Sequence, residues 1–307
     1  MTNNRPLIAH LCAFFACAFW GLMAPLGKDA MTHGFTGIDV VTFRVTGGAV
    51  LFWLTSFFTR QEHVPRRDLL MLIGAALLGL VFNQCCYTMG LSITSPVNAS
   101  IVTTSMPIFA MLLAAIILKE PITGKKAAGV LIGCTGAVIL IATSAAAASS
   151  KVGDIRGDLL CLGAQLSFAL YLTVFRDLIR RYSVITINKW MFTYASIAIL
   201  PFTFGHVSAI DYSAISVSTW LETGFVVVFG TYVSYILMMV GQQTLRPTVV
   251  SIYNYVQPLV SVTVSVLTGI GVFKPSQGLA VILVCLGVWL VTKSKSRRDI
   301  EKASHNS

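Results

Sequence analysis

Apolar stretches of about 20 residues recur along the whole chain, and this recurrence constrains its fold more than any other feature. A helix needs about 20 apolar residues to cross the hydrocarbon core of a bilayer. The 307-residue chain is 55% hydrophobic and only 11% charged, whereas soluble domains carry about 25% charged residues. We therefore expect an all-α integral membrane protein with ten transmembrane helices: 7–27, 38–58, 69–90, 97–118, 127–147, 158–176, 186–204, 217–240, 248–270 and 274–292.

The first stretch imitates a signal peptide, because Arg5 precedes an apolar run that contains the small triplet Ala16-Cys17-Ala18. The run continues to about Gly27, which is too long for a signal peptide, and nine further stretches follow. We interpret it as an uncleaved first helix.

The net charge of +10 is explained by topology. With the N-terminus inside and ten spans, most of the 22 basic residues fall in cytoplasmic segments, as the positive-inside rule requires. The expected protein is a multi-pass protein of the cell (inner) membrane with both termini cytoplasmic. Its environment is the lipid bilayer, and the charge gives no reason to expect a nucleic-acid partner.

The chain repeats itself at a spacing of 151 residues. The prolines Pro107 and Pro258 match at this spacing, and so do Gly79 and Gly230. A second copy that begins after five spans must be inverted in the membrane, as in many secondary transporters. The predicted organisation is a first five-helix repeat (1–142), a linker (143–155), a second inverted repeat (156–292) and a basic cytoplasmic tail (293–307).

Pro107 and Pro258 lie half-way along the fourth and ninth predicted helices. A proline in a helix removes one hydrogen bond, at a cost of about 3 kcal/mol. Irregular backbone at membrane depth is tolerated against protein or a water-filled cavity. We interpret the two positions as helix kinks beside a cavity; kinks that serve helix packing alone are the alternative.

Polar and aromatic side chains near these kinks, and on the first, third and sixth helices, are the candidate substrate-binding residues. For the amide side chains, hydrogen bonding between helices is an equally good explanation. The candidates are Trp20, Asn83, Gln84, Tyr87, Thr103, Thr104, Gln165, Tyr171, Asn254, Tyr255 and Gln257.

Arg44 is the one basic residue well inside a predicted span. Intramembrane charges are costly and usually face an interior or a cavity. Arg44 is therefore a candidate for contact with an anionic substrate group or for gating the outer mouth, and snorkelling to the surface is the alternative. No carboxylate lies near the middle of a span, so the sequence gives no positive support for proton coupling.

No catalytic or cofactor motif occurs in the chain. It lacks nucleophile-elbow, zinc-protease and phosphate-loop patterns. The seven cysteines lie within predicted spans without metal-ligand spacing, so we interpret them as small packing residues. We expect no enzyme activity, no cofactor and no metal.

Four stretches resemble the EamA family of the drug/metabolite transporter superfamily. They are FWGLMAPLGKDA (19–30), FRVTGGAV (43–50), the segment 90–140 with its central proline, and LSFALYLTVFRDLI (166–179). The resemblance covers essentially the whole chain. It implies ten helices, cytoplasmic termini, a substrate cavity between the halves, and export of amino acids or related metabolites.

The same resemblance assigns Glu120 as the acidic residue that closes the fourth helix. Its counterpart at a spacing of 151 is Gly271, so the second copy lacks an acidic residue for a symmetric gating role. At a spacing of 147, Arg44 has Met191 opposite it, so this charge belongs to one half only.

The leading hypothesis is a secondary transporter that exports a small metabolite by alternating access. A multidrug efflux carrier, a passive channel and a non-transporting membrane scaffold or sensor are the alternatives. The sequence leaves open the substrate, the direction of transport, the coupling and the oligomeric state.

Overall fold

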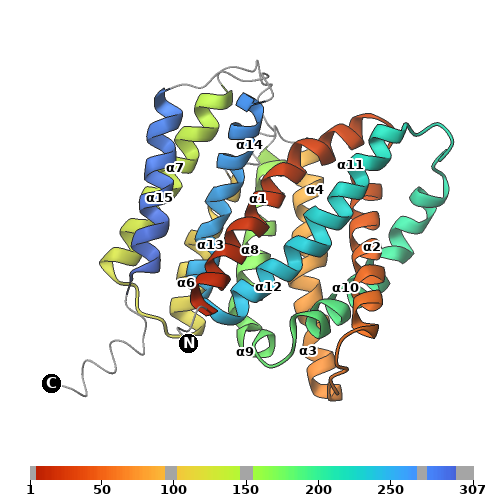
Figure 1. Ribbon diagram of the computed structural model, residues 1–307, viewed down its shortest axis with the longest axis horizontal. Coiled ribbons are helices and arrows are strands. Elements are labelled where there is room, and N and C mark those ends of the chain that lie inside the picture. Colours follow the sequence, from red (N-terminus) through yellow and green to blue (C-terminus); the bar gives the residue numbers. More distant parts are fainter. Residues whose placement is uncertain (1–4, 94–101, 146–154, 268–274, 295–307) are drawn as a thin grey trace.

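A computed structural model describes residues 5–93, 102–145, 155–267 and 275–294 (Figure 1). Across these four ranges the chain is helical and contains no strand. The elements of the first half are α1 (Arg5–Thr32), α2 (Gly37–Phe57), α3 (Arg66–Ala76), the π-helix η1 (Leu77–Phe82), α4 (Asn83–Ile93), α6 (Met106–Ile117) and α7 (Gly124–Ala145).

The second half has a similar order of elements. It contains α8 (Ile155–Val174), α9 (Arg176–Ile179), α10 (Val184–Ser208), α11 (Val217–Val227), the π-helix η2 (Val228–Val233), α12 (Ser234–Thr244), α13 (Pro247–Ile252), the 3₁₀ turn η3 (Tyr253–Tyr255), α14 (Val256–Leu267) and α15 (Pro275–Thr292).

Within the described ranges, five helical segments are long and apolar enough to cross a membrane. They fall on five of the ten predicted spans and comprise Arg5–Met23, Gly37–Phe57, Arg66–Gly90, Ile155–Val174 and Val217–Thr244. Shorter apolar helices occupy Met106–Ile117 and Gly278–Thr292. The fold is thus all-helical with several membrane-spanning candidates, and the ten-helix topology stays a prediction. Parts of the predicted spans 97–118, 127–147, 248–270 and 274–292, and most of 143–155 and 293–307, lie outside the described residues.

Local sequence explains where several helices begin. Thr36 caps α2 in a reciprocal arrangement: its hydroxyl accepts from the amide of Asp39 at 3.3 Å, and its own amide donates to the Asp39 carboxylate at 2.8 Å. The side chains of Ser183 and Ser216 cap α10 and α11 in the same position. These caps begin helices that continue for 21, 25 and 11 residues.

The spacing of 151 residues is also present in the helix boundaries. The run α3–η1–α4 covers 66–93, and α11–η2–α12 covers 217–244, with every internal boundary displaced by the same amount. Figure 1 shows the two runs crossing the molecule in opposite directions: α3 lies low and α4 high, whereas α11 lies high and α12 low.

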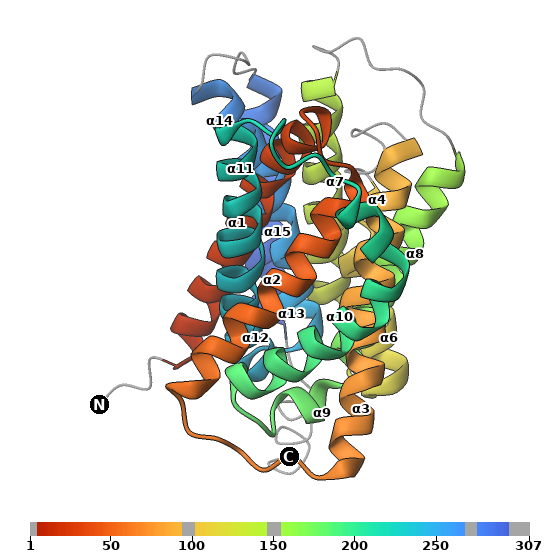
Figure 2. The same ribbon diagram turned by 90° about the vertical axis from the view of Figure 1, so that its right-hand side faces the viewer.

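Neighbouring helices come from different halves of the chain. Helices α7 and α15 lie side by side at the left of Figure 1, and α2 lies against α10 in Figure 2. Helix α1 contacts α12, and α8 contacts α4. Helices of the first half therefore pack mainly against helices of the second half.

Glycines allow the closest of these approaches. A Cβ at Gly287 of α15 would lie 2.7 Å from the carbonyl oxygen of Gly129 and from the Cα of Gly133, both in α7. A Cβ at Gly21 of α1 would lie 2.6 Å from the carbonyl oxygen of Gln257 in α14. Small residues at such contacts let helix backbones approach closely in membranes.

Candidate functional site

In each π-helical segment, a backbone carbonyl accepts a hydrogen bond from a side chain of the other half. In η2 the carbonyl of Gly230 accepts a hydrogen bond from Nε1 of Trp20 at 3.1 Å. In η1 the carbonyl of Leu78 accepts one from the hydroxyl of Ser167 at 2.8 Å. Side chains of α1 and α8 thus satisfy backbone groups that hydrocarbon could not. Single-turn π segments are frequent at functional sites.

The backbone is also irregular just before both predicted kinks. Thr104 and Ser105 form a turn before α6, in which Pro107 is the second residue. The 3₁₀ turn η3 precedes α14, in which Pro258 is the third residue. A proline near a helix start has no amide hydrogen bond to lose within that helix.

A cavity lies among these irregular segments, with side chains from both halves in its wall. The cavity has a volume of about 140 Å³, which is below the roughly 300–1,000 Å³ that is usual for small-molecule sites. Its lining comprises Trp20, Met23, Gly27, Met31, Val40, Arg44, Asn83, Gln84, Tyr87, Thr88, Thr103, Gln165, Phe168, Val226, Tyr235, Asn254 and Gln257.

Nine of the residues singled out from the sequence line this cavity. They are Trp20, Arg44, Asn83, Gln84, Tyr87, Thr103, Gln165, Asn254 and Gln257. Thr103 lies just before α6, and the other eight come from six elements. Their contact with a substrate stays a prediction.

Arg44 belongs to the polar part of the cavity wall and is 8% exposed. Its Nε donates to the hydroxyl of Thr231 at 3.0 Å, and its Nη1 donates to Oε1 of Gln84 at 2.7 Å. Nε2 of Gln84 donates to the hydroxyl of Tyr235 at 3.1 Å. The arginine is therefore held by side chains from η1–α4 and η2–α12 together, rather than directed to the surface.

Two amide side chains of the second half also belong to the polar wall. Nε2 of Gln257 donates to Oδ1 of Asn254 at 2.6 Å, and Nδ2 of Asn254 donates to the sulfur of Met106 at 3.3 Å. Nδ2 of Asn83, another lining residue, donates to the carbonyl of Ala164 at 2.9 Å. Asn83 therefore also serves as the interhelical link that the sequence suggested as an alternative.

Three candidate residues lie outside the cavity wall. The hydroxyl of Tyr171 donates to Oε1 of Gln242 at 3.0 Å, and its ring lies against Gly79. The hydroxyl of Tyr255 donates to the carbonyl of Val130 at 3.2 Å and to that of Thr104 at 3.4 Å. The hydroxyl of Thr104 lies 3.6 Å from the sulfur of Cys134. These residues connect helices behind the wall.

Sequence reasoning missed several lining residues. The internal repeat is the signal that could have identified two of them, Tyr235 and Phe168. A spacing of 151 pairs Gln84 with Tyr235, and a spacing of 148 pairs Trp20 with Phe168. The apolar residues Met23, Met31, Val40 and Val226 carry no sequence signal that separates them from ordinary core residues.

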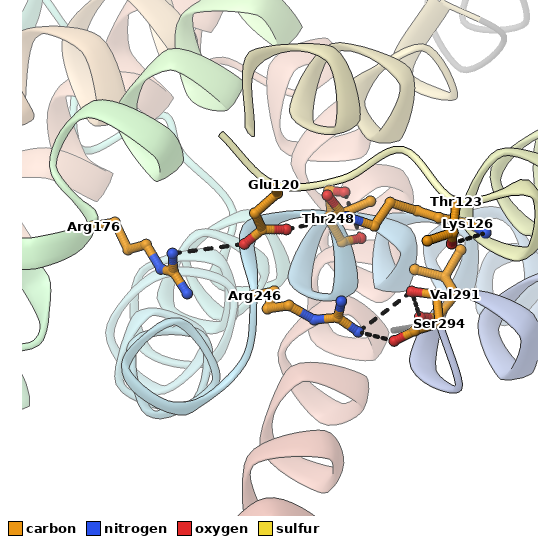
Figure 3. Close-up of polar contacts among 9 residues, drawn as sticks. Glu120, Thr123, Lys126, Arg176, Arg246, Thr248, Val291 and Ser294 are labelled. Carbon is orange, nitrogen blue, oxygen red and sulfur yellow. Dashed lines mark hydrogen bonds and ion pairs between the residues drawn. The ribbon is translucent and has the colours of Figure 1, made fainter. Parts of the chain in front are cut away.

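Glu120 lies away from the cavity, in a buried cluster of charges (Figure 3). Its Oε2 is 3.1 Å from Nζ of Lys126, and its Oε1 is 3.6 Å from Nη1 of Arg176. The neighbouring Arg246 donates from Nη2 to the carbonyl of Ser294 at 2.8 Å. Since Arg176 belongs to α9, the carboxylate of Glu120 connects the two halves of the chain.

Comparison with known proteins decides the family. The model of the EamA-like transporter family matches the chain twice, over residues 7–142 and 155–293. The chain belongs to the EamA-like transporter family. The resemblance inferred from the sequence is thereby confirmed.

Relatives of this EamA-like chain are similar along most of their length. An uncharacterized transporter of Bacillus subtilis, YyaM, is 22% identical over 88% of both chains. A WAT1-related protein of Arabidopsis thaliana is 24% identical over 97% of this chain and 80% of its own. A crystal structure with 18% identity has the same fold, with a TM-score of 0.74 over 92% of this chain and 96% of the other.

Family membership determines the general activity of this EamA-like protein. It is a multi-pass membrane transporter and not an enzyme, as the absence of catalytic motifs in its sequence predicts. Groups of three or more potential metal ligands do not occur in the part of the chain that the structure describes.

Proposed function

We propose that the protein is a secondary transporter that moves a small metabolite out of the cell by alternating access between two inverted five-helix halves. The observation that carries this proposal is the cavity itself, whose wall combines α1, α2 and α4 of the first half with α8, α11, α12, η3 and α14 of the second. Relative movement of the halves would change every side of such a cavity at once.

The opposite directions of α3–α4 and α11–α12 support the inverted arrangement (Figure 1). The start of α1 and the end of α15 lie on the same side of the molecule in this view, which supports termini on one face of the membrane. The positive-inside rule makes that face cytoplasmic.

The cavity extends toward the predicted outer side. Gly27, Met31 and Val40 in its lining flank the short connection between α1 and α2, which the topology places outside. The Glu120 cluster lies at the predicted cytoplasmic ends of its helices, where it connects the halves. We infer an outward-facing state with a closed cytoplasmic side.

The test is solute flux in liposomes that contain the purified protein. A panel of amino acids and related carboxylates is offered, with internal unlabelled solute driving exchange of external labelled solute. Saturable exchange of at least one solute supports the proposal. Conductance that does not saturate indicates a channel, and absence of flux across the panel favours the scaffold or sensor. Repeating the assay with a pH gradient separates proton coupling from facilitated exchange.

A further inference from the structure

The cavity wall contains a positive charge that the protein does not neutralise. Arg44 is 8% exposed and belongs to α2, which is one of the candidate membrane spans. Its two hydrogen-bond acceptors, Thr231 and Gln84, are neutral. No carboxylate within the described ranges forms an ion pair with Arg44. The guanidinium therefore keeps its full charge toward the cavity.

The rest of the lining offers no counter-charge either. Apart from Arg44, its polar members are amides, hydroxyls and an indole, and neither Asp nor Glu occurs among the lining residues. A buried charge without a partner costs several kcal/mol, and ionisable groups at membrane depth mark substrate pathways. The arrangement is therefore stabilised when an anion enters.

Two hydrogen bonds fix the orientation of this guanidinium. Thr231 holds Nε and Gln84 holds Nη1, while Nη2 donates to no acceptor among the residues that the structure describes. Arginine presents its donors in a planar fork that suits carboxylates, and charge-assisted hydrogen bonds of this kind are about twice as strong as neutral ones. Nη2 is the donor left for a ligand.

The apolar lining indicates the remainder of the ligand. Met23, Met31, Val40, Phe168 and Val226 form the non-polar wall, and apolar surface in a pocket accepts an apolar body.

We propose that the substrate is a small organic carboxylate with an apolar body, and that Arg44 binds its carboxylate. This inference rests on the proposed transport function, because it assigns the substrate of the same cavity. A net anion such as a 2-oxo acid and a zwitterion such as an amino acid share this chemistry. The lining provides neutral oxygens and aromatic faces, but no carboxylate, for an ammonium group.

The test compares acids with their amides. The probes are 4-methyl-2-oxopentanoate, phenylpyruvate, leucine and phenylalanine, each paired with its amide, and binding is titrated calorimetrically on detergent-purified protein. We expect the wild-type protein to bind at least one acid at least tenfold more tightly than its amide. Preference for the oxo acids alone identifies a net anion, and preference for the amino acids identifies a zwitterion.

Variants assign the preference to the guanidinium. Arg44→Gln is expected to reduce the difference between acid and amide to less than about twofold, and Arg44→Lys to retain part of it, because lysine keeps the charge without the fork. Arg60→Gln is the control, since Arg60 is exposed in the connection after α2, and it should keep the wild-type preference. A wild-type protein that binds no acid better than its amide overturns the proposal, and so does an Arg44→Gln protein that keeps the preference.

The comparison of acid with amide on the wild-type protein is decisive even if Arg44→Gln does not fold. The same pairs are assayed for flux in liposomes. Acid binding that depends on Arg44 without flux contradicts the transport function and leaves the carboxylate site standing. Equal flux of acid and amide contradicts the carboxylate site and leaves the transport function standing.

Discussion

Trp20 connects the cavity wall to the π-helical segment of the other half. Its Nε1 donates to the carbonyl of Gly230, and its ring lies edge-on to Tyr235 and Phe168 with centroid distances of 5.8 and 6.3 Å. One side chain thus lines the cavity and also satisfies a backbone carbonyl at the irregular turn.

Trp20→Phe should destabilise the protein, because it keeps an aromatic ring and removes the N–H that pairs with Gly230. Loss of a buried hydrogen-bond partner costs about 1–3 kcal/mol. We expect a Tm lower by several degrees in detergent. Trp289→Phe is the control, because Trp289 is 57% exposed on α15. Equal Tm values for the two variants would show that the bond to Gly230 contributes little.

At the residue scale the polar cavity wall was largely predictable, and the residues behind it were not. Asn83, Gln84, Asn254 and Gln257 are polar side chains within apolar runs, which is an unusual pattern in any span. Tyr171 and Tyr255 have the same pattern but use their hydroxyls to join helices. A single sequence does not reveal whether a buried hydroxyl faces a cavity or another helix.

Each of the two π-helical segments directly precedes a helix that carries lining residues of the cavity. Each interrupts a helix midway, shortly before a lining residue of the cavity: Asn83 directly follows η1, and Tyr235 is the second residue after η2. The sequence predicts continuous helices over 69–90 and 217–240, because neither run contains a proline. One extra residue per turn leaves the apolar composition unchanged, so hydropathy alone does not reveal it.

Helix boundaries differ from the predicted spans for a related reason. Helix α1 continues to Thr32 and α10 to Ser208, beyond the predicted ends at 27 and 204. Hydropathy marks the part of a helix that suits hydrocarbon, whereas the backbone hydrogen bonds continue into the polar region outside it.

Close contact between α7 and α15 yields a prediction at the scale of elements. In Gly287→Ala, the added Cβ would meet Gly129 and Gly133 at 2.7 Å, and both contacts are to backbone. The helices must separate, so we expect a markedly lower Tm and less protein recovered from the membrane. Gly163→Ala in α8 is the matched control, because its Cβ would meet nothing within 4 Å. Gly287→Ala with a wild-type Tm would contradict the close contact.

On the scale of the whole molecule, the Glu120 cluster and the cavity lie in different parts of the same junction. Lys126 and Arg176 approach Glu120 from the first and the second half (Figure 3), whereas the cavity extends toward the connection between α1 and α2. The sequence resemblance assigned Glu120 to the end of a helix, but its two partners are visible only in three dimensions. If the halves rock, the ion pair between Glu120 and Arg176, which joins the two halves, must break when the cytoplasmic side opens.

Glu120→Gln is expected to shift the protein toward the cytoplasm-open state. The substitution removes the negative charge from a side chain that is 6% exposed, and it leaves Lys126 and Arg176 without their counter-charge. Asp177→Asn is the control, because Asp177 is an exposed carboxylate on α9 without an ion pair among the described residues.

Labelling of one cavity position from each side of the membrane tests alternating access most directly. Gln257→Cys, in a protein whose seven native cysteines are replaced, is treated with a membrane-impermeant thiol reagent from outside or inside sealed vesicles. In the protein that carries Gln257→Cys and retains Glu120, we predict faster labelling from outside than from inside. Adding Glu120→Gln should raise the rate from inside and lower it from outside, while Asp177→Asn changes neither. Labelling from one side only in all three proteins would contradict alternating access.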